Sequence, residues 1–228
     1  MKREARNVNT SNVSELSDMH PLCAALIDGL SLTGDVPGDA VALLTAHGRA
    51  ETAAHCANVA DEASRLAARF GANGRQAEIA GWLHDISAVI PAAQRLDYAR
   101  QWRLEILPEE AAAPMLLHQR QSAVLAAKVF GVTDPAILSA IGCHTTLKAA
   151  PSALDKIVFL ADKIAWDGAG EPPYQDALLA AVEASLDEAC WCYLDYLWSR
   201  RAALFAVHPW FVAAYHELSD HLERRITP

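Results

Sequence analysis

The chain has 228 residues, of which 52% are hydrophobic, and its formal net charge is −9 at pH 7. This length and this apolar content are sufficient for one well-buried core. The acidic balance excludes general binding of nucleic acid, which needs a basic surface. It still allows a small anionic substrate, held in a cleft by local cations.

The amino-terminal segment, residues 1–18, is polar and has no hydrophobic period, which predicts a disordered leader. It lacks the apolar centre of a signal peptide, and no apolar run reaches the roughly 18 residues that a membrane helix needs. The cysteines are odd in number and match no zinc-binding spacing. We therefore expect a cytoplasmic protein with reduced, mostly buried thiols, at Cys23, Cys56, Cys143, Cys190 and Cys192.

From residue 19 onward the sequence predicts one helix after another, without a repeat or a linker. Residues 51–70 are the clearest case, because Val59, Ala63, Leu66 and Phe70 recur at helical spacing. Gly71 fits the left-handed position that often follows a helix. We expect the next helices at Arg75 to about Leu83, capped by Asn73, and from Pro91 to near Trp102.

The second half of the chain shows the same start and stop signals. We expect helices at about 119–130, from Pro135 with Thr133 or Asp134 as cap, from Ser152 to about Asp167, at about 174–203, and from His208-Pro209 onward. The fold class is therefore all-α. We expect a single domain over 19–228, with a core at about 45–170 and additional helices at 174–226.

Six residues that can bind metal lie on apolar helix faces or at predicted helix ends. Taken singly, a buried histidine is usually a hydrogen-bonded core residue, and Asp85 alone could cap a turn. Asp162 is harder to explain in this way, because an unpaired buried carboxylate is unfavourable unless a cation compensates it. Six separate coincidences are less economical than one metal site formed by His55, His84, Asp85, His118, His144 and Asp162.

These donors also define a chemistry. Imidazole and carboxylate ligands suit iron, manganese, zinc or magnesium. Two carboxylates and four imidazoles are enough for two ions, with one carboxylate bridging them. A dinuclear site activates water at neutral pH and holds a phosphate between the ions. The set therefore predicts hydrolysis of a phosphoester or phosphoanhydride.

Polar residues close to these donors are candidates for contact with a phosphate. The cations, Arg120, Lys148 and Lys163, have the alternative of being solvated surface residues. Thr145 and Thr146 can donate hydrogen bonds to a phosphate or can simply end a helix. Aromatic residues at helical spacing are usually core, although they can also form the floor of an adenine pocket; the candidates are Trp166, Trp191, Trp198 and Trp210.

The order His55, His84-Asp85, Asp162 resembles the signature of the HD-domain metal-dependent phosphohydrolases. The surrounding strings resemble the YqeK branch, whose members are symmetrical bis(5'-nucleosyl)-tetraphosphatases. This resemblance covers about residues 45–170, and "WDGAGEPPY" is similar to a subgroup of the branch. The strings are "HCANVADEASRLAARFG", "AEIAGWLHDIS", "LLHQRQSA", "AILSAIGCHTT" and "LDKIVFLADKI".

The resemblance implies a helical HD fold that carries two divalent ions, iron in the first place, with manganese or magnesium as alternatives. His55, His84, Asp85 and Asp162 would hold one ion, and His118 and His144 the second, with Asp85 bridging. Metal-bound water would cleave diadenosine tetraphosphate to two ADP, with Asp85, His84 and Arg120 as catalytic residues. We expect a nucleotide as partner, without nucleic acid or membrane, and leave a homodimer open.

Four positions depart from the common pattern of the branch. Thr52 and Ala88 stand where an Arg and a Lys are usual, Gln119-Arg120 replaces Gly-Lys, and Leu147 replaces a Gly. The metal ligands are intact, while residues near a bound phosphate differ. Two alternatives to the tetraphosphatase therefore stay open: another HD-type nucleotide phosphatase or phosphodiesterase, and a non-catalytic module that binds metal or nucleotide.

Overall fold

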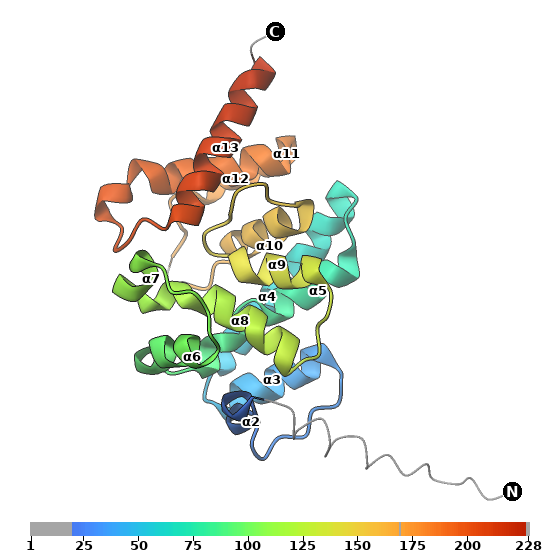
Figure 1. The fold of residues 1–228 in the computed structure, drawn as a ribbon. Coiled ribbons are helices and arrows are strands. Elements are labelled where there is room, and N and C mark those ends of the chain that lie inside the picture. Colours follow the sequence, from blue (N-terminus) through green and yellow to red (C-terminus); the bar gives the residue numbers. More distant parts are fainter. Residues whose placement is uncertain (1–19, 169, 227–228) are drawn as a thin grey trace, which may run out of the picture.

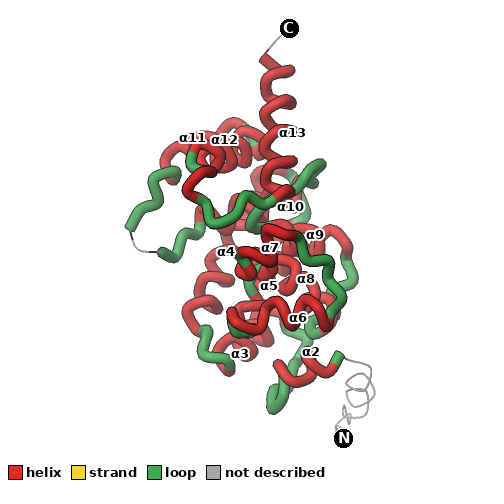
Figure 2. Tube along the Cα trace, turned by 60° about the vertical axis from the view of Figure 1, so that its left-hand side comes forward, coloured by secondary structure: helices red, strands yellow, loops and turns green. Residues whose placement is uncertain are grey.

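The computed structural model describes residues 20–168 and 170–226, and every regular element in these residues is a helix (Figures 1 and 2). The all-α prediction is confirmed, while the predicted leader lies outside the described residues. The α-helices are α2 (Pro21–Leu26), α3 (Val36–Ala46), α4 (Ala50–Phe70), α5 (Gly74–Leu83), α6 (Arg95–Gln101), α7 (Pro108–Ala112), α8 (His118–Lys128), α9 (Pro135–Cys143), α10 (Ala153–Ile164), α11 (Gln175–Ala184), α12 (Leu186–Ser199) and α13 (Pro209–Ile226).

Most helix ends follow from local chemistry that the sequence displays. Gly71 ends α4 in the left-handed conformation, with φ of 70°. The Asn73 side chain accepts hydrogen bonds from the first amides of α5. Asp134 caps α9, and Ser152 forms a capping box with Asp155 at the start of α10. These predicted boundaries are confirmed.

The predicted long helix at 174–203 is wrong. The chain leaves the helix at Ser185, which is extended (φ −169°, ψ 163°), and α12 begins at the next residue. The Ser185 side chain accepts from the amide of Glu188, so a serine followed three residues later by a glutamate starts a new helix here. The segment after Pro91 also differs, because a 3-10 turn (η2, Ala92–Gln94) precedes α6.

The core lies among α4, α5, α8, α9 and α10. α4 packs along α5, and α10 contacts α4, α5 and α9. In Figure 1, α2 and α3 lie at one end of this group and α11–α13 at the other. The C-terminal helices join the core through α12, which packs on α10 and α13. The largest fully buried side chain is Phe159 of α10, so α10 stands at the centre of the packing.

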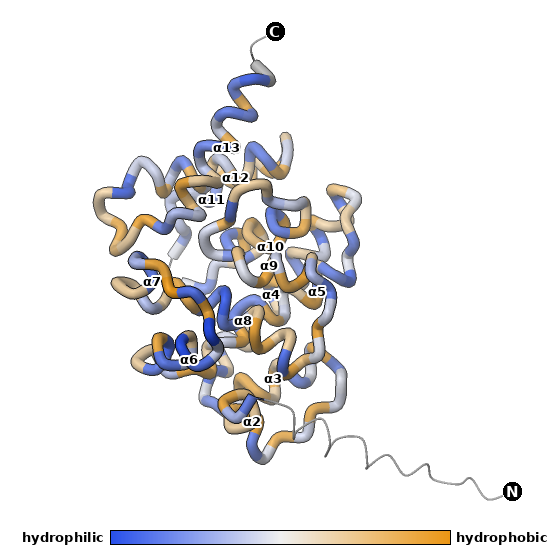
Figure 3. Tube along the Cα trace, viewed as in Figure 1, coloured by the Kyte–Doolittle hydropathy of each residue, from blue (hydrophilic) through white to orange (hydrophobic). Residues whose placement is uncertain are grey.

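Polar and apolar residues are interspersed along the helices in Figure 3, as expected for helices that bury one face. In the described part of the chain, no helix combines the length and the hydropathy that crossing a membrane requires.

Candidate metal centre

Five helices bring all six predicted donors together. His55 lies in the middle of α4, and His84 directly follows the last residue of α5. The other donors come from the turn after α5, the first residue of α8, the residue after α9, and α10; they are Asp85, His118, His144 and Asp162. Two overlapping groups among them, which share His84, have the spacing of a metal site: His55, His84 and Asp162, and His84, Asp85 and His144.

The first half of the cluster is built around Asp162. Its Oδ1 lies 3.2 Å from Nε2 of His55 and 3.6 Å from Nε2 of His84. The two Nε2 atoms lie 3.3 Å from each other. The three groups therefore converge on one point, where a single cation would reach all of them.

Asp85 connects this half with the second. Its Oδ2 lies 3.8 Å from Nε2 of His84, whereas its Oδ1 lies 3.5 Å from Nε2 of His118 and 3.5 Å from Nε2 of His144. The Nε2 atoms of His118 and His144 are 3.0 Å apart. The two oxygens of Asp85 thus face different sets of imidazoles.

Backbone carbonyls orient three of the four imidazoles. The Nδ1 atoms of His84, His118 and His144 lie 2.8, 2.5 and 2.8 Å from the carbonyl oxygen three residues earlier in each case. A neutral imidazole that donates from Nδ1 carries its lone pair on Nε2. Lone pairs that face one another across about 3 Å need a positive charge between them. This donor set fits a divalent cation.

The carboxylates of the cluster stay ionised. Burial favours the neutral acid of Asp162, but Lys163 and the imidazoles of His55 and His84 outweigh burial and hold the pKa of Asp162 well below its usual range. The pKa of Asp85 is also held far below its usual range, because its histidine neighbours, His84 first, outweigh burial. Ionised carboxylates are the form that binds metal.

Two imidazoles of the cluster have pKa values displaced in opposite directions. Burial lowers the pKa of His118 to about 4, and its neighbour His144 adds to this effect. His118 is therefore neutral at pH 7, as a metal ligand must be. Burial opposes the charge on His84 as well, but Asp85, Cys56 and Asp162 raise its pKa well above the usual value.

A cavity of about 220 Å³ opens onto the cluster. Lys163 closes one side, with its Nζ 2.5 Å from Oδ2 of Asp162 and 3.4 Å from the carbonyl oxygen of His144. Trp166 lies in the wall of the cavity with 48% of its surface exposed. The sequence did not indicate three further wall residues, because only the packing of the segment after α10, the start of α11 and α12 brings them together here; they are Asp167, Tyr174 and Tyr193.

The two predicted threonines have different surroundings. The Thr145 hydroxyl lies 2.9 Å from Nε2 of His118, at the cluster. Thr146 is buried, and its hydroxyl is bonded to the side chain of Gln119 and to the carbonyl of Leu147. The buried Gln119 amide also accepts from the amides of both threonines, so it holds this turn together. A phosphate contact is thus easier for Thr145, and both contacts stay predictions.

Arg120 and Lys148 lie in the wall of a separate cavity of about 440 Å³. The Arg120 guanidinium is bonded to the buried carboxylate of Glu110 and to the carbonyl of Glu105, and it lies over the ring of Trp210. The Lys148 ammonium is 3.3 Å from Asp155. Both cations therefore have carboxylate partners of their own, and their predicted contact with substrate stays a prediction.

Leu147 shows how this chain accommodates one departure from the common pattern. Its φ is 56°, in the left-handed region that favours glycine, and its side chain is fully buried. Left-handed backbone disfavours a leucine by about 1–2 kcal/mol. Complete burial of the same side chain contributes about 1.5–3 kcal/mol, so the packing offsets the strain.

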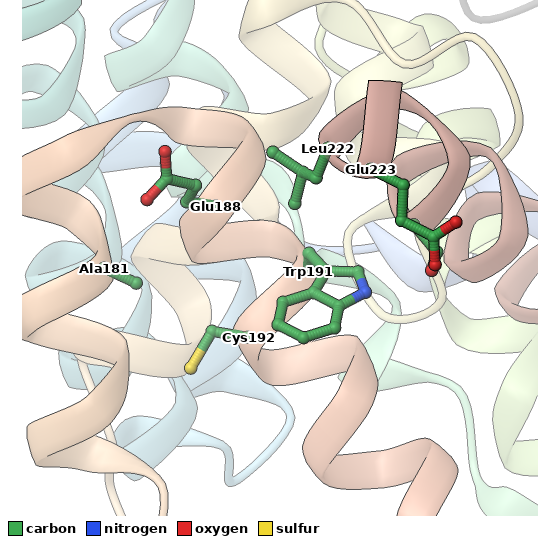
Figure 4. Close-up of a pocket in the computed structure, with 7 residues that line it drawn as sticks. Ala181, Glu188, Trp191, Cys192, Leu222 and Glu223 are labelled. Atoms are coloured by element: carbon green, nitrogen blue, oxygen red, sulfur yellow. The ribbon is translucent and has the colours of Figure 1, made fainter. Parts of the chain in front are cut away.

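The largest of the described cavities, about 760 Å³, lies away from the cluster between α11, α12 and α13 (Figure 4). Trp191 and Cys192 of α12 line it, with Leu222 of α13 opposite. None of the six predicted donors reaches it. Cavity size alone would therefore point to a different part of the molecule than the donor chemistry does.

An all-helical core that gathers histidines and aspartates at the ends and centres of its helices defines an HD-type hydrolase. The model of the HD domain matches residues 52–167, which contain all six donors. The chain belongs to the HD-domain family. HD domains bind divalent metals, and the cluster described above is a part of the described chain that can do so.

Similar proteins come from several bacteria. An uncharacterized protein in the pepC 5' region of Lactococcus lactis subsp. cremoris is 44% identical over 147 residues, 64% of this chain and 74% of that protein. A symmetrical bis(5'-nucleosyl)-tetraphosphatase of Bacillus subtilis is 31% identical over 137 residues, 59% of this chain and 71% of that enzyme.

A solved structure has the same fold. It is a "predicted HD superfamily hydrolase involved in NAD metabolism" from Clostridium acetobutylicum, with a TM-score of 0.74 and 27% identity. The match covers 83% of this chain and 98% of that one. The similarity therefore extends well beyond the residues of the HD domain itself.

Proposed function

We propose that the protein hydrolyses dinucleoside tetraphosphates, diadenosine tetraphosphate in particular, to two nucleoside diphosphates at a centre of two divalent ions. The observation that carries this proposal is the position of Asp85. One of its oxygens faces His84 and the other faces His118 and His144. A carboxylate in this position serves two cations at once, and a pair of cations is suited to displacement at phosphorus.

The six donors would divide between two ions. His55, His84 and Asp162 surround one position, His118 and His144 the other, and Asp85 contributes to both. Divalent ions at such a site lower the pKa of water and neutralise negative charge on phosphate oxygens. A mixed imidazole and carboxylate set suits iron or manganese well and magnesium less well. Iron is our first candidate.

The surroundings of the cluster support an anionic substrate. The buried ammonium of Lys163 lies in the wall of the cavity beside Asp162. Its positive charge would offset part of the charge of a bound phosphate chain. The hydroxyl of Thr145 is at hydrogen-bond distance from His118 and would donate to the same phosphate.

Trp166 supplies the surface for a nucleobase. It is the only tryptophan among the described residues that line the cavity of the cluster, and its ring is half-exposed. Gly168 lies so close to this ring that an added Cβ would be 2.2 Å from its Cζ2. Stacking of a base on an aromatic ring contributes about 1–3 kcal/mol. We propose that one adenine of the substrate stacks on Trp166.

Support also comes from relatives. Symmetrical bis(5'-nucleosyl)-tetraphosphatases of Bacillus subtilis and Staphylococcus aureus are 31% and 28% identical to this chain. This chain has a candidate cation site and a cavity beside it, where a tetraphosphate could be bound.

The experiment is turnover of diadenosine tetraphosphate by protein loaded with iron or with manganese, with nucleotide products separated. Asp85→Ala is the test variant. Asp61→Ala, on an exposed position of α4, is the control. ADP as the only product, lost in Asp85→Ala and kept in Asp61→Ala, is the expected result. Formation of AMP and ATP, or no turnover by protein that holds two ions per chain, would overturn the proposed substrate.

A further inference from the structure

His55 differs from the other three histidines in what faces its Nδ1 atom. The others direct Nδ1 to a backbone carbonyl three residues earlier. Those carbonyls are accessible because each of these histidines sits next to the end of a helix or 3-10 turn. His55 lies in the middle of α4, where the helix itself uses the preceding carbonyls. Its Nδ1 is buried and has no hydrogen-bond partner among the described residues.

One carboxylate lies close to this atom. Oδ2 of Asp167 is 3.6 Å from Nδ1 of His55. Asp167 follows α10 in the segment that also carries Trp166, and it lines the cavity of the cluster. Its side chain is 60% exposed, so it is free to move. A shift of roughly 0.6 Å would bring the pair to the length of a normal hydrogen bond.

The two ring nitrogens of His55 have separate tasks. Nε2 lies 3.2 Å from Oδ1 of Asp162, at the position where a cation would be bound. A cation at Nε2 requires the lone pair there, and the proton of the neutral ring must then sit on Nδ1. A proton on a buried Nδ1 needs an acceptor, because an unsatisfied buried donor costs about 1–3 kcal/mol.

We infer that Asp167 is the positioning residue of the metal centre that accepts the Nδ1 proton of His55, as backbone carbonyls do for the other three imidazoles. Resting on the proposed metal site, this inference assigns a role to a residue outside the six donors. A carboxylate that accepts from a metal-binding histidine fixes the tautomer and the orientation of the ring. Loss of such a partner typically weakens metal binding about 10–100-fold.

The same contact links the metal to the segment after α10. A cation that draws the proton of His55 toward Asp167 also holds the neighbouring Trp166 at the cavity. Occupancy of the cation position next to Asp162 would therefore order the surface that we propose for the nucleobase.

The test is calorimetric titration of the stripped full-length protein with Mn²⁺ alone. Asp167→Ala is the main variant, Asp167→Asn keeps the shape without the charge, and Asp61→Asn is the exposed control on α4. We expect the affinity of one of two sites to fall about 10–100-fold in Asp167→Ala, less in Asp167→Asn, and not at all in the control. Affinity of Asp167→Ala within twofold of the unmodified protein would overturn the inference.

A second measurement reads the tautomer directly. In protein loaded with diamagnetic Zn²⁺, nitrogen-15 spectra of the histidine rings should show a protected Nδ1 proton on His55, and this signal should be lost in Asp167→Ala. Persistence of that signal in the variant would contradict the role of Asp167. Neither measurement uses nucleotide turnover. A failure of the proposed substrate, with metal affinity still dependent on Asp167, is therefore distinguishable from a failure of this inference.

Discussion

Gly81 packs against Ala60 so closely that a Cβ added to Gly81 would lie 2.5 Å from the Cα of Ala60. Both residues are buried. The contact joins α5 to α4. His55 lies within α4, and His84 directly follows α5. Nδ1 of His84 is also bonded to the carbonyl oxygen of Gly81 itself. The approach of these two helices therefore sets how far His84 reaches into the cluster.

Replacing Gly81 by alanine should destabilise the fold and weaken metal binding together. The extra methyl group meets backbone, which cannot turn aside as a side chain can, and overpacking of this kind costs typically 1–3 kcal/mol. The gain in helix propensity is at most about 1 kcal/mol, so the steric effect wins. Urea unfolding and Mn²⁺ titration would measure the two effects.

Gly142→Ala in α9 is the matched control. An added Cβ there would lie 3.7 Å from the Cβ of Ala123, which is an ordinary van der Waals contact. This variant should be as stable as the unmodified protein, or more stable by up to about 1 kcal/mol. Equal stability of the Gly81 and Gly142 variants would show that the close contact with Ala60 has no energetic role.

Removal of the Trp166 ring should raise KM for dinucleoside tetraphosphate. Loss of about 1–3 kcal/mol of stacking free energy corresponds to a KM that is roughly 5–150-fold higher. Trp166→Ala should show this rise, and Trp166→Phe a smaller one. Gly168→Ala should resemble Trp166→Ala, because its Cβ would displace the ring. Steady-state kinetics would measure the change.

Hydrolysis of a substrate without a base, such as inorganic tripolyphosphate, separates stacking from damage to the centre and should be unchanged in Trp166→Ala. Trp191→Phe, in the wall of the cavity between α11 and α13, is the control and should have normal kinetics. An equal loss on both substrates in Trp166→Ala would argue against a base-binding role.

Glu110→Gln should lower stability by about 3 kcal/mol. The Glu110 carboxylate is fully buried, 3.1 Å from the guanidinium of Arg120, and it accepts a hydrogen bond from the amide of Leu107. Breaking a buried ion pair leaves an uncompensated charge, which typically costs 3–5 kcal/mol. A glutamine can still accept hydrogen bonds from Arg120 and from the Leu107 amide, so we expect a loss at the lower end of this range. Thermal and urea unfolding at pH 7 would measure it.

The loss of stability caused by Glu110→Gln should decrease as the pH falls. Burial favours the neutral acid of Glu110, but His208, the Leu107 amide and Arg120 outweigh burial and lower its pKa. A carboxyl group with a lowered folded-state pKa stabilises the protein above its unfolded pKa of about 4.3 and loses this contribution as the pH falls through the folded-state value. The difference in the free energy of unfolding between the unmodified protein and Glu110→Gln should therefore become smaller below about pH 4. Glu171→Gln, at an exposed position, is the control and should unfold with the same free energy as the unmodified protein at every pH.

Thiol labelling should modify one cysteine in the native protein. All five cysteines are free, and only Cys192 is partly exposed. Burial raises the pKa of Cys23 to about 11, so that little of this thiol is ionised at pH 8. Reaction with a chromogenic disulfide at pH 8 should give one fast equivalent, absent in Cys192→Ser. Two or more fast equivalents in the native protein would contradict the packing around the remaining cysteines.

The local features of this protein were predictable from its sequence, because they depend on interactions within a few residues. Gly71 ends α4, and Asn73, Asp134 and Ser152 cap the helices that follow them. The helix break at Ser185 is also a local feature, because the Ser185 side chain accepts a hydrogen bond from the amide of Glu188. The prediction of one continuous helix was wrong because the hydrophobic pattern continues across this break.

The sequence by itself predicted the six residues that the fold gathers into the candidate centre. His84-Asp85 at a helix end and Asp162 in a run of buried apolar residues indicate a bound cation, because a buried charge needs a counter-charge. The order of these residues was enough to expect that they meet. It was not enough to show that the two oxygens of Asp85 face opposite sets of imidazoles.

Only the tertiary structure decided which charged groups meet across the fold. The spacing of Arg120 from His118 suggests a phosphate contact, which stays a prediction, but it gives no sign that the folded chain also pairs Arg120 with the buried Glu110 and the ring of Trp210. The approach of Asp167 to His55 joins residues far apart in the chain. Burial and Coulomb energy depend on distances through space, which helix packing fixes and sequence spacing does not.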